Sequence, residues 1–415
     1  MTTADNAMRK PGQLPDAAKG VGGGTDLLIV GGGIMGLWAA WFAARAGLRT
    51  VLVEKERLGA GASGGLLGAL MPHMPDKWSE KKQFQFDALV SLEEEIAALE
   101  AQTGLSTGYR RSGRLIALPK DHLRAIAERH SRDAETVWQS ESRSFHWQVM
   151  DHSPYGSDWP DPSFTAGGLV HDTLAARLFP RHLLTALRRA LEDHPAVTLL
   201  EGVFLTRLDP HTGSAQLSDG RELAFAHVVL AAGVESFALL SQWAAPGSDS
   251  PRLGTGVKGQ AALLKADIDP SWPLLYLDGL YVVPQEGGVV AIGSTSENRY
   301  DDPVSTDAQL DDLLQRAVAL VPSFRNAPVL ERWAGVRPKA VERDPMVGPH
   351  PDLPRLIALT GGFKVSFGLA HRLAQAALLP LLGSGPVLPA SFTLAHHLQC
   401  AGHRHTSDKK NSRNS

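Results

Sequence analysis

A glycine-rich turn between two apolar segments constrains the fold more than any other feature of this sequence. The segment DLLIV (26–30) is typical of a buried parallel strand, and GGGIMG (31–36) follows it directly. A helix is predicted from Gly33 to about Ala46, and TVLVEKE (50–56) is predicted as a second strand. These residues therefore predict one β-α-β unit.

The turn matches the pattern G-x-G-x-x-G at Gly31, Gly33 and Gly36. Such glycines allow a tight turn and let a pyrophosphate approach the amino end of the following helix. Glu54 lies at the end of the second predicted strand, about 20 residues further on, where an acidic side chain can bind a ribose hydroxyl. A carboxylate there would repel the 2′-phosphate of NADP. The alternative is a glycine-rich turn beside a surface glutamate.

The same glycine pattern occurs twice more, as GAGASG (59–64) and GTGVKG (254–259). Neither match follows a buried strand and opens a helix, so we interpret both as chance matches or loops.

The rest of the chain alternates predicted helices and strands, without an internal repeat. Apolar periodicity predicts helices over 79–102, 180–191 and 307–320, and buried strands over 228–233 and 355–363. Short β-like segments separated by turn residues predict an antiparallel sheet within 251–330.

Composition excludes several classes of protein. A net charge of −3 argues against a dedicated nucleic-acid binder, and the single cysteine, Cys400, permits no internal disulfide and favours the reducing cytoplasm. We find neither a signal peptide nor a segment long enough to span a membrane. Residues 1–25 are predicted to be a flexible leader and 401–415 a disordered tail. The histidines lack metal-binding spacing, so no metal is expected.

Several segments, taken in order, resemble the family of flavoproteins that includes glycine oxidase, sarcosine oxidase and D-amino-acid oxidase. They are 26–55, 59–65 (GAGASGG), 227–233 (HVVLAAG), 257–260 (VKGQ), 279–297 and 333–375. The resemblance implies an α/β fold. An FAD-binding Rossmann-like domain of the glutathione-reductase type would carry an inserted antiparallel β-rich substrate domain. We assign 26–100, 166–250 and 331–390 to the FAD-binding domain, and 101–165 and 251–330 to the substrate domain.

The resemblance implies FAD as the cofactor. Relatives that bind flavin covalently use a cysteine ahead of the last segment, where this chain reads AGVRPKAVERD, so non-covalent FAD is expected. The residues expected to contact FAD are Gly31, Gly33, Ile34, Met35, Gly36, Glu54, Lys55, Ala62, Ser63, Gly64, Val203, Ala232, Gly233, Gly335, Gly361, Gly362, Phe363 and Lys364.

The resemblance also implies residues for the chemistry. Arg337 lies where glycine-oxidase-like relatives place an arginine that binds the substrate carboxylate, and Lys364 lies in a GFK segment similar to that of sarcosine oxidases. Tyr281 lies on a strand expected above the flavin, and His73 lies near the expected substrate entrance, where it could set the protonation of an amine. The structural alternatives are an interdomain salt bridge for Arg337, a lysine at the flavin edge for Lys364, and purely structural roles for Tyr281 and His73. Lys258, in VKGQ, is interpreted as a residue at the start of a strand, and the alternative is an approach to the active site.

The implied function is oxidation of the C–N bond of a small amino acid or of a secondary or N-methyl amine. Hydride would pass to flavin N5, and the resulting imine would hydrolyse. Oxygen or another acceptor would then take the electrons. The alternatives are a flavoenzyme that modifies a tRNA base, a 2-hydroxy-acid oxidising flavoprotein, and a non-catalytic FAD-binding protein. The sequence leaves the substrate, its chirality, the acceptor and the oligomeric state open.

Overall fold

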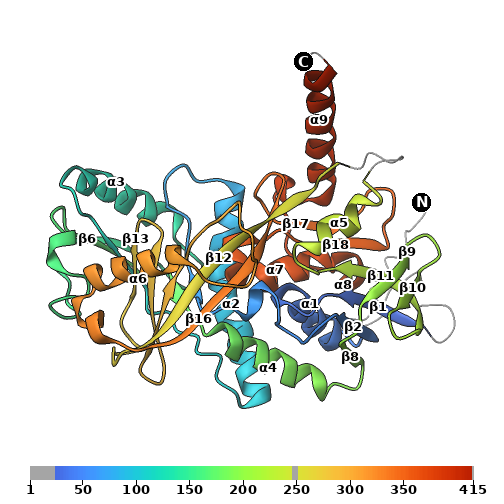
Figure 1. Ribbon diagram of the computed structural model, residues 1–415, viewed down its shortest axis with the longest axis horizontal. Helices are drawn as coiled ribbons and strands as arrows, with labels where there is room; N and C mark the ends of the chain where they lie inside the picture. Colours follow the sequence, from blue (N-terminus) through green and yellow to red (C-terminus); the bar gives the residue numbers. More distant parts are fainter. Residues whose placement is uncertain (1–23, 245–250, 414–415) are drawn as a thin grey trace, which may run out of the picture.

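The computed structural model describes residues 24–244 and 251–413. Two large β-sheets lie toward opposite ends of an elongated molecule, and the long strands β12 and β16 run diagonally between them (Figure 1). Nearly all of the predicted leader falls outside the described residues, and Thr25, its last residue, already begins β1.

The first sheet carries the β-α-β unit predicted from the glycine pattern. Its strand order is β17-β18-β11-β1-β2-β8, with β10 and β9 added beside β11. Strands β18, β11, β1, β2 and β8 are parallel, whereas β17 is antiparallel to β18. The bounds are β1 (Thr25–Val30), β2 (Thr50–Glu54), β8 (Val197–Glu201), β9 (Leu205–Asp209), β10 (Ser214–Leu217), β11 (Glu222–Leu230), β17 (Met346–Pro349) and β18 (Leu356–Thr360).

Alternating side chains of β1 face two separate cores. Leu27 and Ile29 pack with the helices on one side, whereas Leu28 and Val30 pack with residues of β11 and α5 on the other. Helix α1 (Ile34–Arg45) lies within the first core, and each of its residues from Ile34 to Ala44 is buried. A helix covered on all sides needs apolar residues on all sides, which explains the segment IMGLWAAWFAA.

The predicted helices are present with small shifts at their ends. They are α2 (Glu80–Thr103), α4 (Pro180–Glu192) and α6 (Ala308–Leu320). The other helices are α3 (His122–Val137), α5 (Glu235–Ser241), α7 (Ser366–Ala377), α8 (Leu379–Leu382) and α9 (Leu394–Arg413). Within the described ranges, none of the helices combines the length and the apolar character that a membrane crossing requires.

The second sheet has the order β16-β12-β15-β14-β13-β4-β6-β5. Its bounds are β4 (Arg114–Ala117), β5 (Trp147–Met150), β6 (Leu169–Asp172), β12 (Gly254–Lys265), β13 (Leu274–Leu277), β14 (Leu280–Gln285), β15 (Val289–Gly293) and β16 (Val329–Ala340). The pairing is antiparallel, as predicted for 251–330, except that β13 and β4 are parallel. Strands β3 (Ala69–Leu70) and β7 (Ala176–Arg177) form a separate short pair.

Two features of the second sheet bear on expectations from the sequence. The segment GTGVKG forms the first half of β12, so it is not a loop, and its match to the glycine pattern is a chance one. Strands β6 and β16 belong to the second sheet, although their residues were assigned wholly or mostly to the FAD-binding domain. In both cases strand pairing across the chain decides the structure, and local sequence does not report it. The division into domains as a whole stays a prediction.

The C-terminal segment differs most from expectation. Helix α9 continues from Leu394 through Arg413 and projects from the body of the molecule (Figure 1). The prediction of a disordered tail is therefore wrong for residues 401–413. Low apolar content suggested disorder, but a helix already anchored by the buried Leu394 can be extended through a polar segment that contains no proline.

Candidate active site

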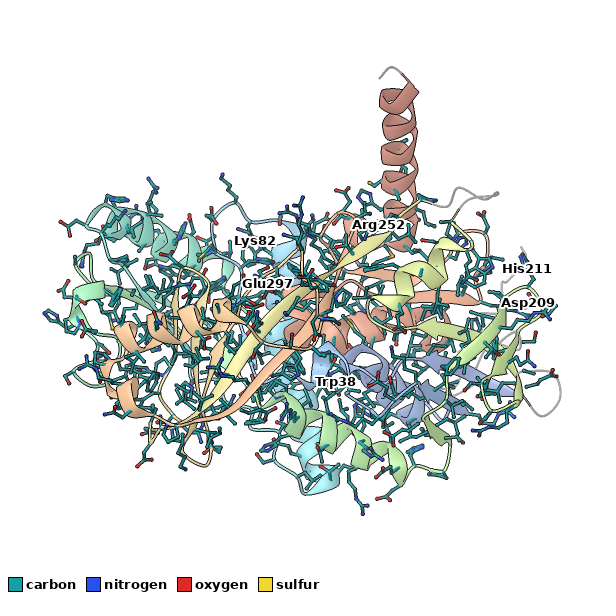
Figure 2. The ribbon with its side chains drawn as sticks, viewed as in Figure 1. Trp38, Lys82, Asp209, His211, Arg252 and Glu297 are labelled. Carbon is teal, nitrogen blue, oxygen red and sulfur yellow. The ribbon has the colours of Figure 1, made fainter. Side chains whose placement is uncertain are left out.

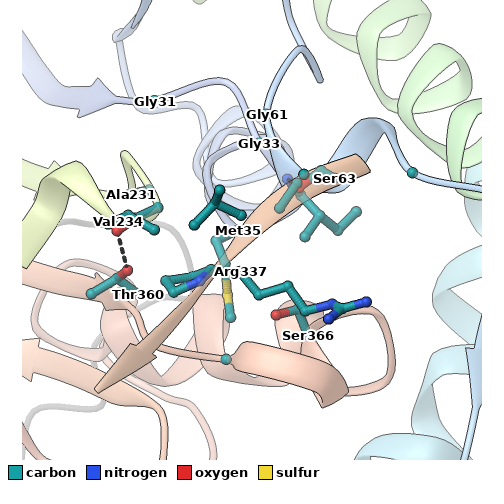
Figure 3. A pocket seen from close by; sticks show the side chains of 18 of the residues that line it. Gly31, Gly33, Met35, Gly61, Ser63, Ala231, Val234, Arg337, Thr360 and Ser366 are labelled. Atoms are coloured by element: carbon teal, nitrogen blue, oxygen red, sulfur yellow. Dashed lines mark hydrogen bonds between the residues drawn. The ribbon is translucent and has the colours of Figure 1, made fainter. Parts of the chain in front are cut away.

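A cavity of about 890 Å³ opens where the parallel strands β1, β11 and β18 end. Ligands in open α/β sheets bind at this carboxyl edge, where neighbouring strands connect in opposite directions. Figure 3 shows residues from the turns after these strands facing β16, which carries Arg337. The cavity is thus bounded by the first sheet on one side and by strands of the second sheet on the other, and its size suits a large ligand.

The amino end of α1 points into the cavity. Gly31, Gly33, Ile34 and Met35 line the cavity. Gly36 lies beneath the wall, where an added methyl group would be 1.9 Å from the carbonyl oxygen of Gly31. Only glycine allows the turn and the helix to approach this closely, and the approach leaves the helix amides facing the open space.

The small-residue loop after β2 completes this end of the cavity. The loop includes the short helix η2 (Ala62–Gly64), and Ala62 and Ser63 line the cavity. The Ser63 hydroxyl accepts a hydrogen bond of 3.0 Å from the amide of Ile34. Gly64 faces away, since a methyl group there would be 2.4 Å from the Gly59 carbonyl oxygen. The loop is thus fixed against the helix terminus.

Acidic groups lie at this end of the cavity. The Glu54 carboxylate accepts hydrogen bonds from the amides of Gly32 (2.7 Å) and Glu56 (3.0 Å). A carboxylate has about four acceptor positions, so Glu54 keeps free lone pairs toward the cavity. Lys55 pairs with Glu235 at 2.5 Å, and this hydrogen bond is the main reason that the pKa of the ammonium is raised.

Two turns after parallel strands form the middle of the cavity. Ala232 and Gly233 follow β11, and Gly361 and Gly362 follow β18. The Thr360 hydroxyl donates a 2.8 Å hydrogen bond to the Gly233 carbonyl oxygen and ties the two turns together (Figure 3). Phe363 adopts a φ of 47°, an uncommon value for a residue with a side chain. Such strain is concentrated at functional sites.

Arg337 projects from β16 into the other end of the cavity. Its Nη1 donates a 3.2 Å hydrogen bond to the carbonyl oxygen of Thr295. Burial lowers the pKa of the guanidinium, and the neighbouring Tyr281 and Glu297 oppose this shift. Among the described residues, no carboxylate lies within 4.0 Å of the Arg337 side chain to form an ion pair.

Lys364 and Tyr281 line the same end of the cavity. Burial first, and the charge of Arg337 second, lower the pKa of the Lys364 ammonium, which lies 5.7 Å from the centre of the Phe363 ring. In the described ranges Lys364 also lacks a carboxylate partner. Burial raises the pKa of Tyr281, with Tyr276 as the next cause, so its hydroxyl stays protonated at neutral pH.

Most of the residues predicted for the site line the cavity, including Val203 and Gly335, but three do not. These are Gly36 and Gly64, which lie behind the wall, and His73. The backbone amide of His73 donates a 2.6 Å hydrogen bond to the Gln85 side chain, and the residue as a whole is exposed, although its imidazole is buried enough for burial to lower the imidazole pKa. Gln85 lines the cavity instead. Lys258 was placed at the start of a strand, but it lies within β12 and is 2% exposed.

Several lining residues were not predicted. Thr360, Ser294, Met71 and Phe367 line the cavity together with Gln85. Of these, only Thr360 and Phe367 had a signal in the sequence, since they flank the GGFK segment. Ser294 and Met71 come from strand ends whose place depends on sheet pairing. Among the described residues, no group of three or more His, Cys, Asp or Glu side chains is arranged to hold a metal ion.

The two ends of the cavity suit the two ends of FAD. The amides at the start of α1 and the loop at Ser63 can hold a pyrophosphate, and Glu54 has free acceptors for ribose hydroxyls. The turns at Gly233 and Gly361 expose backbone in the middle of the cavity, where a flat ring needs close approach. The residues present therefore fit an FAD that extends from Glu54 toward Arg337.

Comparison with known proteins agrees with this geometry. The sequence matches the DAO family model, described as FAD dependent oxidoreductase, over residues 26–376. A curated relative, glycine oxidase of Pseudomonas putida, is 29% identical over an alignment of 384 positions that covers 88% of this chain and 97% of the relative.

Solved structures share the fold. Glycine oxidase from Geobacillus kaustophilus superposes with a TM-score of 0.77 at 21% identity, covering 89% of this chain and 98% of that chain. Iminodiacetate oxidase from Chelativorans superposes with a TM-score of 0.75 at 21% identity, covering 88% and 98%.

Proposed function

The chain belongs to the family of FAD-dependent oxidoreductases, and from this premise we propose that it oxidises the C–N bond of a small amino acid or N-methyl amino acid. The reaction would give an imine, which hydrolyses to a carbonyl compound and an amine. The glycine oxidase relative and the iminodiacetate oxidase fold support an amine donor that carries a carboxylate.

One observation carries the proposal: two cations without a carboxylate partner among the described residues face one end of the cavity. They are Arg337 and Lys364. Arg337 is half-buried and Lys364 is exposed, and a ligand that covered them would bury both charges, at a cost in free energy unless it brings an anion. The carboxylate of an amino acid can supply that charge, and the guanidinium fork can bind both of its oxygens. Tyr281 can donate a further hydrogen bond, because its raised pKa keeps the hydroxyl protonated.

The chain's own contribution is then binding and orientation. FAD, when bound, supplies the acceptor for the hydride. Arg337 and Lys364 hold the carboxylate, which fixes the neighbouring α-carbon, and apolar residues such as Met71 and Leu89 limit water around the substrate. Among the described residues that line the cavity there is no histidine. None of these lining residues is therefore a histidine base that could take the proton from the substrate amine.

A matched substrate panel tests this function. Glycine is compared with methylamine, and N-methylglycine with dimethylamine, because each of these partners lacks only the carboxylate. Each compound is added without oxygen to the purified FAD-containing protein. We expect the visible flavin absorbance to bleach with at least one carboxylate-bearing amine and with neither partner. Glycolate is added as the matching 2-hydroxy acid, and bleaching by glycolate alone would reassign the reaction. Absence of bleaching by all of these compounds would contradict the proposal.

The lowered pKa of Lys364 predicts a pH dependence of carboxylate binding. The attraction is complete while the ammonium is protonated, and it is lost as pH rises through its pKa, which lies below the ordinary lysine value. Acetate is the probe, because it has no amine to titrate, and its dissociation constant is measured from the flavin spectrum between neutral and alkaline pH. We expect acetate to bind more weakly as pH rises. In Lys364→Arg the side chain stays charged over this pH range, so the binding should not weaken. An equal weakening in Lys364→Arg would exclude Lys364 as the titrating group.

The electron acceptor and the location complete the proposal. Oxygen uptake measured against reduction of an artificial dye decides between an oxidase and a dehydrogenase. The single cysteine supports a reducing compartment, so we keep the cytoplasm as the proposed location.

A further inference from the structure

The guanidinium of Arg337 lies directly on the backbone of Gly259. In the ladder between β12 and β16, Gly259 pairs with Gly335, and Val257 pairs with Arg337. The arginine side chain therefore folds back along the sheet toward Gly259. A methyl group added at Gly259 would lie 2.0 Å from Nη1 and 2.1 Å from both Cζ and Nη2. No side chain larger than hydrogen fits there while Arg337 keeps its position.

The Thr295 carbonyl holds the guanidinium from a second direction, and a further rung of hydrogen bonds fixes this carbonyl. The segment from Thr295 to Glu297 continues past β15 and pairs with β12, through amide-to-carbonyl bonds of 3.0 and 2.9 Å between Lys258 and Glu297. The amide of Gln260 donates a 2.9 Å hydrogen bond to the Thr295 hydroxyl. Thr295 is thus held by its backbone and by its side chain.

A buried charged network lies behind this segment. The Glu297 carboxylate accepts from the Thr295 hydroxyl and, at 2.9 Å, from the Gln260 amide group. Lys258 lies 3.8 Å from Glu297 and 3.5 Å from Asp307. Figure 2 shows Glu297 near the middle of the molecule, beside β12.

This network is costly to bury, which argues that it does more than fill space. Lys258 is 2% exposed, Glu297 6% and Gln260 0%. Apolar residues of similar volume would often stabilise a fold as well or better. Fully hydrogen-bonded polar groups, in contrast, fix one geometry in the way that a supporting layer behind a binding residue must.

We propose that the backbone of Gly259 and the carbonyl of Thr295 form a guanidinium seat that positions Arg337 for the substrate carboxylate. Lys258, Gln260 and Glu297 hold the seat in place. The proposal rests on the proposed function and names further positioning residues for it. A guanidinium fixed before binding loses less side-chain entropy when the carboxylate arrives, so the seat increases affinity without touching the ligand.

Gly259→Ala tests the seat, since its methyl group must displace the guanidinium. The dissociation constant of acetate is measured from the flavin spectrum of the FAD-containing protein, together with FAD content. We expect acetate to bind on the order of tenfold or more weakly, as for loss of a hydrogen bond to a charged group. Gly254→Ala is the matched control: it lies on the same strand, its methyl group would meet the Phe237 ring at 2.5 Å, and it should not weaken acetate binding.

Combination with Arg337→Ala separates positioning from general damage. If Gly259 acts through Arg337, then Gly259→Ala adds nothing to the weaker acetate binding of Arg337→Ala, whereas an additive loss would overturn the seat. If Gly259→Ala binds acetate as tightly as the wild type while Arg337→Ala binds it weakly, then Gly259 does not position Arg337. The proposed function would still stand. Wild-type protein that binds no acetate would overturn both.

Thr295→Val decides the question if Gly259→Ala fails to fold or to retain FAD. It keeps the branched shape and removes only the hydroxyl that ties Thr295 to Glu297. We expect acetate to bind roughly threefold more weakly, in the range of one neutral hydrogen bond, and we expect no further loss in the Arg337→Ala background. If Thr295→Val binds acetate as tightly as the wild type, the proposed positioning of Arg337 would be contradicted.

Discussion

Arg337→Ala is expected to lower kcat/KM for the best amino-acid substrate by a factor of about 100, the range expected when hydrogen bonds to a charged group are lost. Arg337 lies at the end of the cavity beside Tyr281 and has no ion-pair partner among the described residues, so its charge is available to a ligand. Arg337→Lys keeps the charge without the planar fork, and its activity should lie between those of the wild type and the alanine variant. Steady-state kinetics with the substrate that bleaches the flavin measure both effects.

The control for this variant lies on the same strand. Arg332 also projects from β16, but its guanidinium is exposed and pairs with Asp311 at 2.6 Å. Arg332→Ala should leave kcat/KM unchanged, because the side chain does not line the cavity and an exposed ion pair contributes little. Unchanged kinetics in Arg337→Ala would show that the carboxylate binds elsewhere, whatever the result for Arg332→Ala.

The sequence predicted the nucleotide end of the cavity better than the substrate end. Gly31, Gly33 and Glu54 belong to one contiguous β-α-β unit, whose geometry follows from local rules. Arg337 and Lys364 were identified only by resemblance to a family, since no local pattern shows that they lie at one end of one cavity. Both line it in the structure, and their roles stay proposals until they are tested.

Strand pairing is what sequence reasoning could not supply. Gly259 and Arg337 meet because the β12–β16 ladder sets Gly259 opposite Gly335, and a register shifted by one residue would turn the arginine to the other face. For His73 the prediction failed in the other direction, because a residue near the loop in sequence was expected near the cavity in the structure. His73 is close in sequence to the small-residue loop, but it does not line the cavity, whereas Gln85, which accepts a hydrogen bond from its amide, does.

A second large effect is expected in stability, at the buried ion pair between Arg114 and Asp172. Arg114 Nε lies 2.5 Å from the Asp172 carboxylate, and the two side chains are 3% and 0% exposed. Arg114→Leu would leave Asp172 as a buried charge with only the amide of Ala175 to stabilise it. We expect the free energy of unfolding to fall by about 3–5 kcal/mol. Urea denaturation followed by tryptophan fluorescence, with FAD in excess, measures the loss.

Two comparisons separate burial of charge from loss of arginine contacts. The exposed pair Arg189–Asp193, with side chains 57% and 63% exposed, should lose less than about 0.5 kcal/mol in Arg189→Leu. Arg114→Leu combined with Asp172→Asn removes both charges and keeps an acceptor for the Ala175 amide, so it should recover most of the loss. If the double variant is as unstable as Arg114→Leu, the contacts of the Arg114 guanidinium with Trp147 and Met71 are its main contribution, and the unpaired carboxylate is a minor one.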